Sequence, residues 1–210
     1  MSPRIIRIED AGPEHKARRL VFDDGSDPRT TSATVAKALG LEEGLDLPMD
    51  ALETALQQAE APRARERALQ LLEYRERSVA ELTRKLRDSG YGAALVLATV
   101  ARCAELGLVD DERFAEVWVR SRTSAGHGSR RIRRELAEKG VSPDVIAIAL
   151  GRECTPEQEL ARARAALRGQ RALNRRDRDR LVRRLVARGF DLPVALQVLG
   201  ESADESDLTS

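Results

Sequence analysis

The chain has 210 residues, of which 41% are hydrophobic, 34% are charged and 3% are aromatic. Sheet sandwiches and barrels draw on aromatic and β-branched residues, whereas Ala, Leu, Arg and Glu, which favour helices, dominate here. Cys103 and Cys154 are too few cysteines for a secreted disulfide scaffold. Residues 1–16 carry several charges and no long apolar run, which argues against a signal peptide or a membrane span. We therefore expect a mainly α-helical protein of the reducing cytoplasm.

The first part of the chain, residues 1–62, is predicted to form a small extension with strands and short helices. Residues 4–9 and 18–23 are β-prone and are separated by a polar loop, a pattern typical of a β-hairpin. A helix is expected to begin near Ser32. A second short helix is expected to end at Pro62, because proline disrupts a helix interior.

From residue 64 onward the sequence contains a threefold internal repeat with periods of 50 and 49 residues. Each repeat has two apolar residues four positions apart, which share one helix face. A glycine follows four residues later, and glycine readily adopts the left-handed conformation that ends a helix. An apolar residue comes next. The three series are Leu82, Leu86, Gly90 and Tyr91; Ile132, Leu136, Gly140 and Val141; and Leu181, Leu185, Gly189 and Phe190.

Each repeat is completed by a helical segment before the apolar pair and by another after the glycine. Units of three helices and about 50 residues are typical of helical repeats, which bury little apolar surface alone and therefore stack into elongated arrays. The expected limits are residues 63–110, 111–153 and 154–200, followed by a disordered acidic tail at 201–210. Core positions expected in the upstream segments are Leu69 and Leu72, Phe114 and Trp118, and Leu160, Ala161, Ala165 and Leu167, and those expected after the glycines are Leu95, Val145 and Val194.

Charge is distributed unevenly along the chain, although the net charge is only +1. Residues 1–62 contain 7 basic and 12 acidic residues, residues 63–200 contain 29 and 19, and residues 201–210 contain none and 4. A basic body between acidic ends favours a nucleic-acid or other polyanionic partner. The alternative is an ordinary solvated surface in an arginine-rich protein, and charge alone does not separate the two.

Arginines surround the outer side of the predicted helix of the middle repeat. At about 100° per residue, Arg130 and Arg134 lie opposite the apolar pair, and Arg131 and Arg133 lie on its flanks. Acidic neighbours at i±4 could explain some of these charges structurally, and Arg84 alone is best explained as a surface charge. The candidate binding residues are Arg120, Arg122, Arg130, Arg131, Arg133 and Arg134, with Arg84 and Arg183 at the position equivalent to Arg134, and Arg175 and Arg176 in the third repeat.

No enzyme active site is predicted. The sequence lacks a P-loop motif and a Gly-x-Gly-x-x-Gly motif. His127 could contact phosphate, but a lone loop histidine is more often simply exposed. Cys103 lies on an apolar helical stripe, and Asp110 to Glu112 are typical of a helix N-terminus. We expect no catalytic residues, no metal site and no cofactor.

Three segments resemble the signature of the RecX family: YRERSVAELTRKLRDSGY (74–91), ELGLVDDERFAEVWVRSR (105–122) and GSRRIRRELAEKGV (128–141). The resemblance covers residues 64–200 and is strongest over 66–150. It implies a curved, elongated array of three repeats without catalytic residues or cofactor.

The same resemblance implies a regulator of homologous recombination and DNA repair. Such a protein would bind the filament groove of the RecA recombinase, mostly inhibit its ATPase and strand exchange, and bind single- and double-stranded DNA. The basic surface of the middle repeat would be the binding surface, and we expect a monomer. The alternatives are a DNA-binding protein without RecA specificity, either sequence-nonspecific or built like a helix-turn-helix regulator, and a helical array that binds only proteins.

Overall fold

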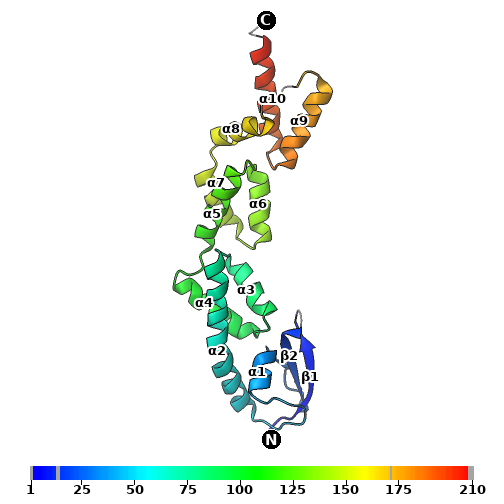
Figure 1. The fold of residues 1–210 in the computed structure, drawn as a ribbon, viewed down its shortest axis with the longest axis vertical. Helices are drawn as coiled ribbons and strands as arrows, with labels where there is room; N and C mark the ends of the chain where they lie inside the picture. The colour runs from blue at the N-terminus through cyan, green and yellow to red at the C-terminus, as the bar shows by residue number, and fades with distance from the viewer. Residues whose placement is uncertain (1, 13–14, 171, 208–210) are drawn as a thin grey trace. The chain divides into compact units, whose positions relative to one another are not determined.

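The computed structural model describes residues 2–12, 15–170 and 172–207, and side chains as far as residue 200. Within these residues it contains ten helices and one three-stranded antiparallel sheet (Figure 1), so the mainly helical class is confirmed. The chain divides into two compact units, Met1–Asp110 and Asp111–Ser210. None of the helices in the described ranges is long and apolar enough to cross a membrane.

The predicted hairpin is present as β1 (Ile5–Ala11) and β2 (Ala17–Phe22), with Ile8 opposite Leu20. A third strand, β3 (Arg29–Ser32), pairs with β2 on the other side and is not predicted by its sequence, which lacks apolar alternation. Helix α1 (Ala33–Ala38) begins as expected, with the Ser32 hydroxyl accepting a hydrogen bond from the backbone N–H of Val35.

The prediction that Pro62 ends a helix is wrong, because Pro62 lies inside the 26-residue helix α2 (Met49–Tyr74). An interior proline removes one helical hydrogen bond and costs about 3 kcal/mol. Burial on both sides of the proline outweighs this cost, since Leu52 packs in the core of the N-terminal extension and Leu71 packs in the core of the first repeat. Arg63 Nη1 also donates to the Ala59 carbonyl of the same helix (2.8 Å). The helix therefore crosses the limit expected at residues 62–63.

The three predicted repeats share one pattern of burial. All six members of the apolar pairs are at most 1% exposed. After each glycine, however, the sixth residue is buried and the fifth is not: Leu95, Val145 and Val194 are half-buried, whereas the residues that follow them are buried. The helices of the repeats are α3 (Val79–Asp88), α4 (Ala93–Glu105), α5 (Asp111–Ser124), α6 (Ser129–Glu138), α7 (Pro143–Glu153), α8 (Pro156–Leu167), α9 (Arg175–Ala187) and α10 (Leu192–Asp207).

Each repeat glycine has positive φ, with values of 93°, 77° and 93° at Gly90, Gly140 and Gly189. In the first repeat, Gly90 N donates to the Arg87 carbonyl and Tyr91 N donates to the Leu86 carbonyl. The same two bonds recur in the other repeats. This pair of bonds defines the Schellman motif, in which glycine avoids the strain of the left-handed conformation. The repeat prediction is thus confirmed at the level of the backbone.

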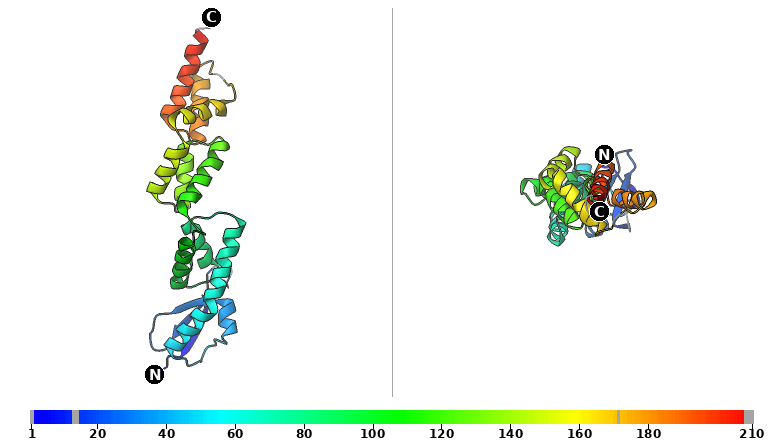
Figure 2. Two further views of the ribbon diagram at one scale, coloured as in Figure 1. Left: turned by 90° about the vertical axis from the view of Figure 1, so that its left-hand side faces the viewer. Right: turned by 90° about the horizontal axis from the view of Figure 1, so that it is seen from above.

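Several details of the upstream helices differ from the predictions. Leu69, Ala161 and Ala165 are exposed, because α2 and α8 direct Ala68, Leu71, Ala163 and Ala166 into the core instead. Phe114 is buried as expected and Trp118 is half-buried against the same cluster. Helix α10 extends to Asp207, into the segment expected to form an acidic tail; residues 208–210 lie outside the described residues. Within Asp111–Ser210, α10 packs against both α8 and α9 (Figure 2).

Candidate nucleic-acid and partner interface

Helix α6 carries the densest group of predicted binding residues. Its sequence SRRIRRELAE buries only Ile132 and Leu136, both 0% exposed, in a core shared with α5 and α7. Arg130, Arg133 and Arg134 are exposed on the rest of the helix surface, as the helical angles predict. Three guanidinium groups are thereby presented on one short helix that is fixed by its buried residues.

The six arginines expected to form the basic surface of the middle repeat have different partners. Arg130 and Arg133 form no ion pair with any of the described residues. Arg134 has one long contact, 3.6 Å from Nε to Glu138 Oε1, and both side chains are more than 65% exposed. Such exposed pairs contribute little free energy and are easily exchanged for another anion. These three arginines are therefore available to a ligand.

Arg122 and Arg131 instead converge on one carboxylate. Their Nε atoms each lie 2.8 Å from an oxygen of Glu135, to which Trp118 Nε1 also donates (3.1 Å). Burial alone would raise the pKa of Glu135, but the hydrogen bonds from Arg131 and Arg122 outweigh burial and lower it below its ordinary value. Arg122 also lies over the Trp118 ring, 4.2 Å from its centroid. These contacts join α5 to α6, so both arginines have a structural role.

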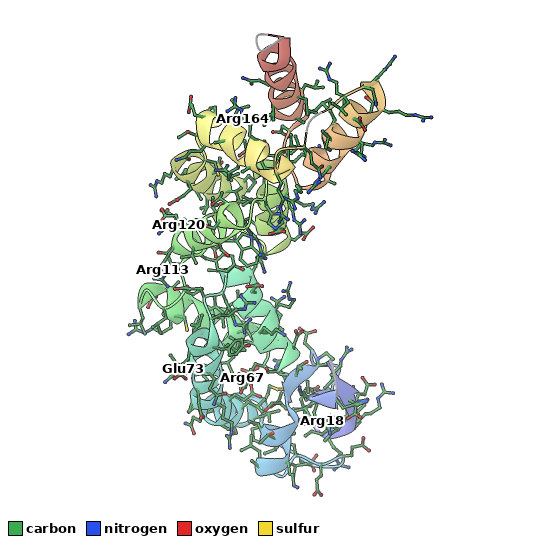
Figure 3. The ribbon with its side chains drawn as sticks, turned by 45° about the horizontal axis from the view of Figure 1, so that its top comes forward. Arg18, Arg67, Glu73, Arg113, Arg120 and Arg164 are labelled. Atoms are coloured by element: carbon green, nitrogen blue, oxygen red, sulfur yellow. The ribbon has the colours of Figure 1, made fainter. Side chains whose placement is uncertain are left out.

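Arg120 belongs to a third environment, on the side of α5 that meets α7 (Figure 3). Its guanidinium contacts Glu153 at 3.1 Å and Glu116 at 3.4 Å, while Arg152 contacts Glu116 at 2.6 Å. The structure therefore does not bring Arg120 into the group formed by Arg130, Arg133 and Arg134. Sequence adjacency on a helix could not reveal the contact with Glu153, because Glu153 comes from α7.

The candidates outside the middle repeat are exposed but are not gathered around α6. Arg175 and Arg176 begin α9, whereas the opposite end of that helix approaches α6. Arg183 is exposed on α9, and its Nε donates to the Asp179 carbonyl one turn earlier (3.2 Å). Arg84 is exposed on α3 in the other unit. The outward direction of the equivalent positions Arg84, Arg134 and Arg183 agrees with the prediction.

The position of α6 is fixed by a contact between repeats that the sequence does not suggest. Its N-cap, Gly128, has no side chain to satisfy the first N–H groups. Those groups are satisfied from the third repeat: the buried Glu159 of α8 accepts from Ser129 N (2.9 Å), and the carbonyl of Gly189 accepts from Arg130 N (3.0 Å). A Cβ on Gly128 would overlap the backbone of Gly189 and Phe190. The exposed arginines of α6 are thus held on a rigid support.

Other candidate groups have structural surroundings. Cys103 is buried in the core of the first repeat. The Nδ1 atom of His127 is buried without a hydrogen-bond partner, and burial, followed by the charge of Arg131, lowers its pKa. Asp111 and Glu112 lie in the first turn of α5, as predicted. In the ranges that the structure describes, no three His, Cys, Asp or Glu side chains group as they would around a metal ion.

Two family models match this chain. Residues 64–103 match the model of the RecX first three-helix domain, and residues 110–150 match the model of the RecX second three-helix domain. The second match contains α6 and its arginines.

Curated relatives named regulatory protein RecX align with this chain over most of their own length. The protein of Mycolicibacterium smegmatis is 39% identical over 167 residues, which is 72% of this chain and 88% of that protein. The protein of Vibrio parahaemolyticus is 37% identical over 135 residues, which is 63% of this chain and 87% of that protein.

Solved structures support the same fold at lower identity. A crystal structure of regulatory protein RecX aligns with a TM-score of 0.62 and 22% identity, covering 93% of this chain and 98% of the other. The crystal structure of RecX from Lactobacillus salivarius aligns with a TM-score of 0.63 and 20% identity, covering 70% and 98%. At this identity they establish the fold, and the sequence relatives establish descent: the chain belongs to the RecX family of regulatory proteins.

Proposed function

We propose that this protein binds the RecA recombinase on DNA and limits its strand exchange and ATPase activity. It would act in homologous recombination and DNA repair as a cytoplasmic monomer, without catalytic residues or a cofactor of its own. The repeat limits 63–110, 111–153 and 154–200 belong to the same proposal, as units along which the partner would bind.

The observation that carries the proposal is the exposed trio Arg130, Arg133 and Arg134 on α6. These side chains lie in the segment matched by the second RecX domain, and two of them form no ion pair with described residues. The guanidinium group matches the geometry of both phosphates and carboxylates, so the same surface can contact the DNA of a filament and acidic side chains of RecA. Glu159 and Gly189 hold this surface in one position, which reduces the ordering cost of binding.

The direct test is a strand-exchange assay with RecA and saturating amounts of this protein. We expect strong inhibition by the unmodified chain and weaker inhibition by Arg130→Glu. Arg102→Glu is the matched control, because Arg102 is also exposed but pairs with Glu105 on α4 and is not a candidate. Undiminished exchange with the unmodified chain would contradict the proposed function. If Arg130→Glu and Arg102→Glu weaken inhibition equally, α6 is not part of the interface.

Contact with phosphates has its own signature in salt dependence. Each phosphate contact on duplex DNA contributes about 0.9 to the slope of log affinity against log salt. We expect the double substitution Arg130→Glu and Arg134→Glu to lower the slope by about 1 to 2, measured by fluorescence anisotropy. An unchanged slope would mean that neither arginine contacts a phosphate and that both are ordinary solvated surface charges.

The alternative is a DNA-binding protein without RecA specificity, favoured by the same exposed arginines. It predicts DNA binding that RecA does not strengthen, and a helix-turn-helix regulator would additionally select a defined operator sequence. A pull-down with RecA, with and without DNA, separates these functions. Retention that requires RecA supports the proposed function, retention that requires only DNA supports the alternative, and retention by RecA without any affinity for DNA indicates a purely protein-binding array.

A further inference from the structure

A cleft of about 560 Å³ lies within Met1–Asp110, between the N-terminal extension, α2 and the turn that follows α3. Two of its lining residues, Arg63 and Arg67, lie one turn apart on α2, and Lys16 lines it from the start of β2. Figure 3 shows Arg67 on the side of α2 toward the extension. Glu66 is the one carboxylate among the described lining residues. The cleft therefore has an excess of positive charge inside a unit whose first 62 residues are acidic overall.

The two arginines of the cleft retain unused donors. Arg63 Nη1 donates to the Ala59 carbonyl at 2.8 Å, and Arg67 Nη1 lies 3.4 Å from Gln70 Oε1. Neither side chain forms an ion pair with a described residue, and both are exposed. Because a guanidinium group has five N–H donors, each arginine can still bind an anion through its remaining donors.

Tyr91 distinguishes this cleft from the equivalent surfaces of the other repeats. It occupies the position after the repeat glycine, where the second and third repeats bury Val141 and Phe190. Tyr91 is only half-buried and lines the cleft. Burial and, next, the charge of Glu60 raise its pKa, whereas the charges of Arg67 and Arg63 oppose that rise, so the phenol lies within the field of both arginines. An aromatic ring beside two guanidinium groups is a combination that binds bases and phosphates together.

The walls of the cleft are held together by close backbone contacts. A Cβ on Gly90 would lie 2.6 Å from the Lys16 carbonyl oxygen, so only glycine allows the α3 turn to approach β2 this closely. The same Lys16 carbonyl accepts from Ala33 N (2.8 Å). On the other wall, the buried Glu60 of α2 accepts hydrogen bonds from Thr31 Oγ1 and from Ser32 N. A site with such fixed walls needs little reorganisation to bind.

We propose that this cleft binds a segment of single-stranded nucleic acid, with phosphates on Arg63 and Arg67 and a base against Tyr91. The site lies outside the candidate surface of the middle repeat and extends the proposed function by a second nucleic-acid contact. It requires no RecA, so it is tested with DNA alone. A negative strand-exchange result would therefore contradict the proposed function but not nucleic-acid binding in this cleft. Absence of binding in the cleft would contradict this inference but not RecA binding by α6.

The test measures binding of a fluorescent single-stranded oligothymidylate to the full chain by anisotropy over a range of salt concentrations. The background carries Arg130→Glu and Arg134→Glu, so that α6 contributes little. Adding Arg63→Glu and Arg67→Glu should weaken binding at least tenfold and lower the salt slope by about 1.4, since a single-strand contact contributes about 0.7. The matched control is Arg65→Glu, which is exposed on the same helix between the two but does not line the cleft; it should change affinity less than twofold.

Tyr91 is tested by two substitutions whose folding is checked by thermal unfolding. Tyr91→Phe keeps the ring and should bind within twofold of the parent. Tyr91→Val reproduces the residue of the second repeat and should weaken binding at least fivefold. Equal affinities for both, or no difference between the Arg63–Arg67 and Arg65 variants, would overturn the proposal. Thymidine monophosphate is the competitor: displacement of the strand at micromolar concentration would show a nucleotide pocket and would overturn binding of a strand.

Discussion

Of the three repeat helices that end in the same glycine turn, the first and the third pack this turn against unrelated neighbours. In Met1–Asp110, the turn at Gly90 packs against Lys16 of the N-terminal extension. In Asp111–Ser210, the turn at Gly189 packs against Arg131 of the preceding repeat, and a Cβ there would lie 2.7 Å from the Arg131 backbone nitrogen. The repeat pattern therefore specifies the turn but not its partner. One turn supports the cleft lined by Arg63 and Arg67, and the other supports the exposed arginines of α6.

Each contact is accompanied by a buried glutamate that accepts a hydrogen bond from a backbone N–H across it. Glu60 of α2 accepts from Ser32 N and also from the Thr31 hydroxyl, and Glu159 of α8 accepts from Ser129 N. The glutamates differ in charge balance. Glu159 lies 2.6 Å from Arg162 Nη2, whereas no described cation forms an ion pair with Glu60. The same mechanical role is thus filled by an ion pair in one unit and by a carboxylate with neutral donors in the other.

The largest expected effect is that of Gly189→Ala. The left-handed conformation costs a β-carbon about 1–2 kcal/mol, and overlap with Arg131 adds about 1–3 kcal/mol of packing strain. We expect a loss of about 2–5 kcal/mol in the free energy of unfolding of Asp111–Ser210. Urea unfolding followed by fluorescence of Trp118, the single tryptophan, measures this unit.

Gly169→Ala is the matched control, because Gly169 has φ of 72° but nothing within 4 Å of its Cβ position. It should cost only the conformational part, about 1–2 kcal/mol. Gly90→Ala should act like Gly189→Ala but in Met1–Asp110, which contains both tyrosines, Tyr74 and Tyr91. If Gly189→Ala and Gly169→Ala cost the same, the close approach to α6 does not stabilise the unit.

A smaller effect should separate the two glutamates. Glu159→Gln leaves the side chain of Arg162 without its counter-charge, and Arg162 is 16% exposed. Breaking a fully buried pair costs about 3–5 kcal/mol, so this partly exposed one should cost about 2 kcal/mol. Glu60→Gln retains an acceptor for Thr31 and Ser32 and should cost less than about 1 kcal/mol. If both substitutions lower the free energy of unfolding equally in urea titrations, the charge of Glu159 does not contribute to stability.

The sequence predicts what depends on local spacing. The apolar pairs, such as Leu82 with Leu86, and the positive φ of Gly90 follow from helical periodicity and from the freedom of glycine, and all are confirmed. The exposure of Arg130 and Arg134 follows from the same angles. Binding of RecA or DNA by these arginines stays a prediction.

Features that depend on distant contacts could not be predicted. Strand β3 forms because β2 and Glu60 supply its hydrogen-bond partners, and Glu60 lies 29 residues after Thr31 in the sequence. Helix α2 passes Pro62 because two separate cores bury its ends. The arginines of the middle repeat have different partners because Glu135 and Glu153 come from other helices than α5, which carries Arg120 and Arg122. No local pattern contains these pairings.

The smallest effect is a pH dependence with opposite sign in the two units. Burial raises the pKa of Glu60 above its ordinary value despite its hydrogen bonds from Thr31 and Ser32, so between these two values the folded unit binds more protons than the unfolded one. Its contribution to stability therefore falls as pH rises through that window. Glu135 has a lowered pKa, because its bonds with Arg131 and Arg122 outweigh burial, and its contribution to stability is lost as pH falls below the ordinary value.

The measurement is the unfolding free energy of the unmodified chain minus that of Glu60→Gln or Glu135→Gln, followed from neutral to acidic pH. The difference for Glu60→Gln should increase on acidification, and the difference for Glu135→Gln should decrease. If both differences change in the same direction, the unpaired Glu60 and the ion-paired Glu135 are stabilised alike, and the contrast between them is wrong.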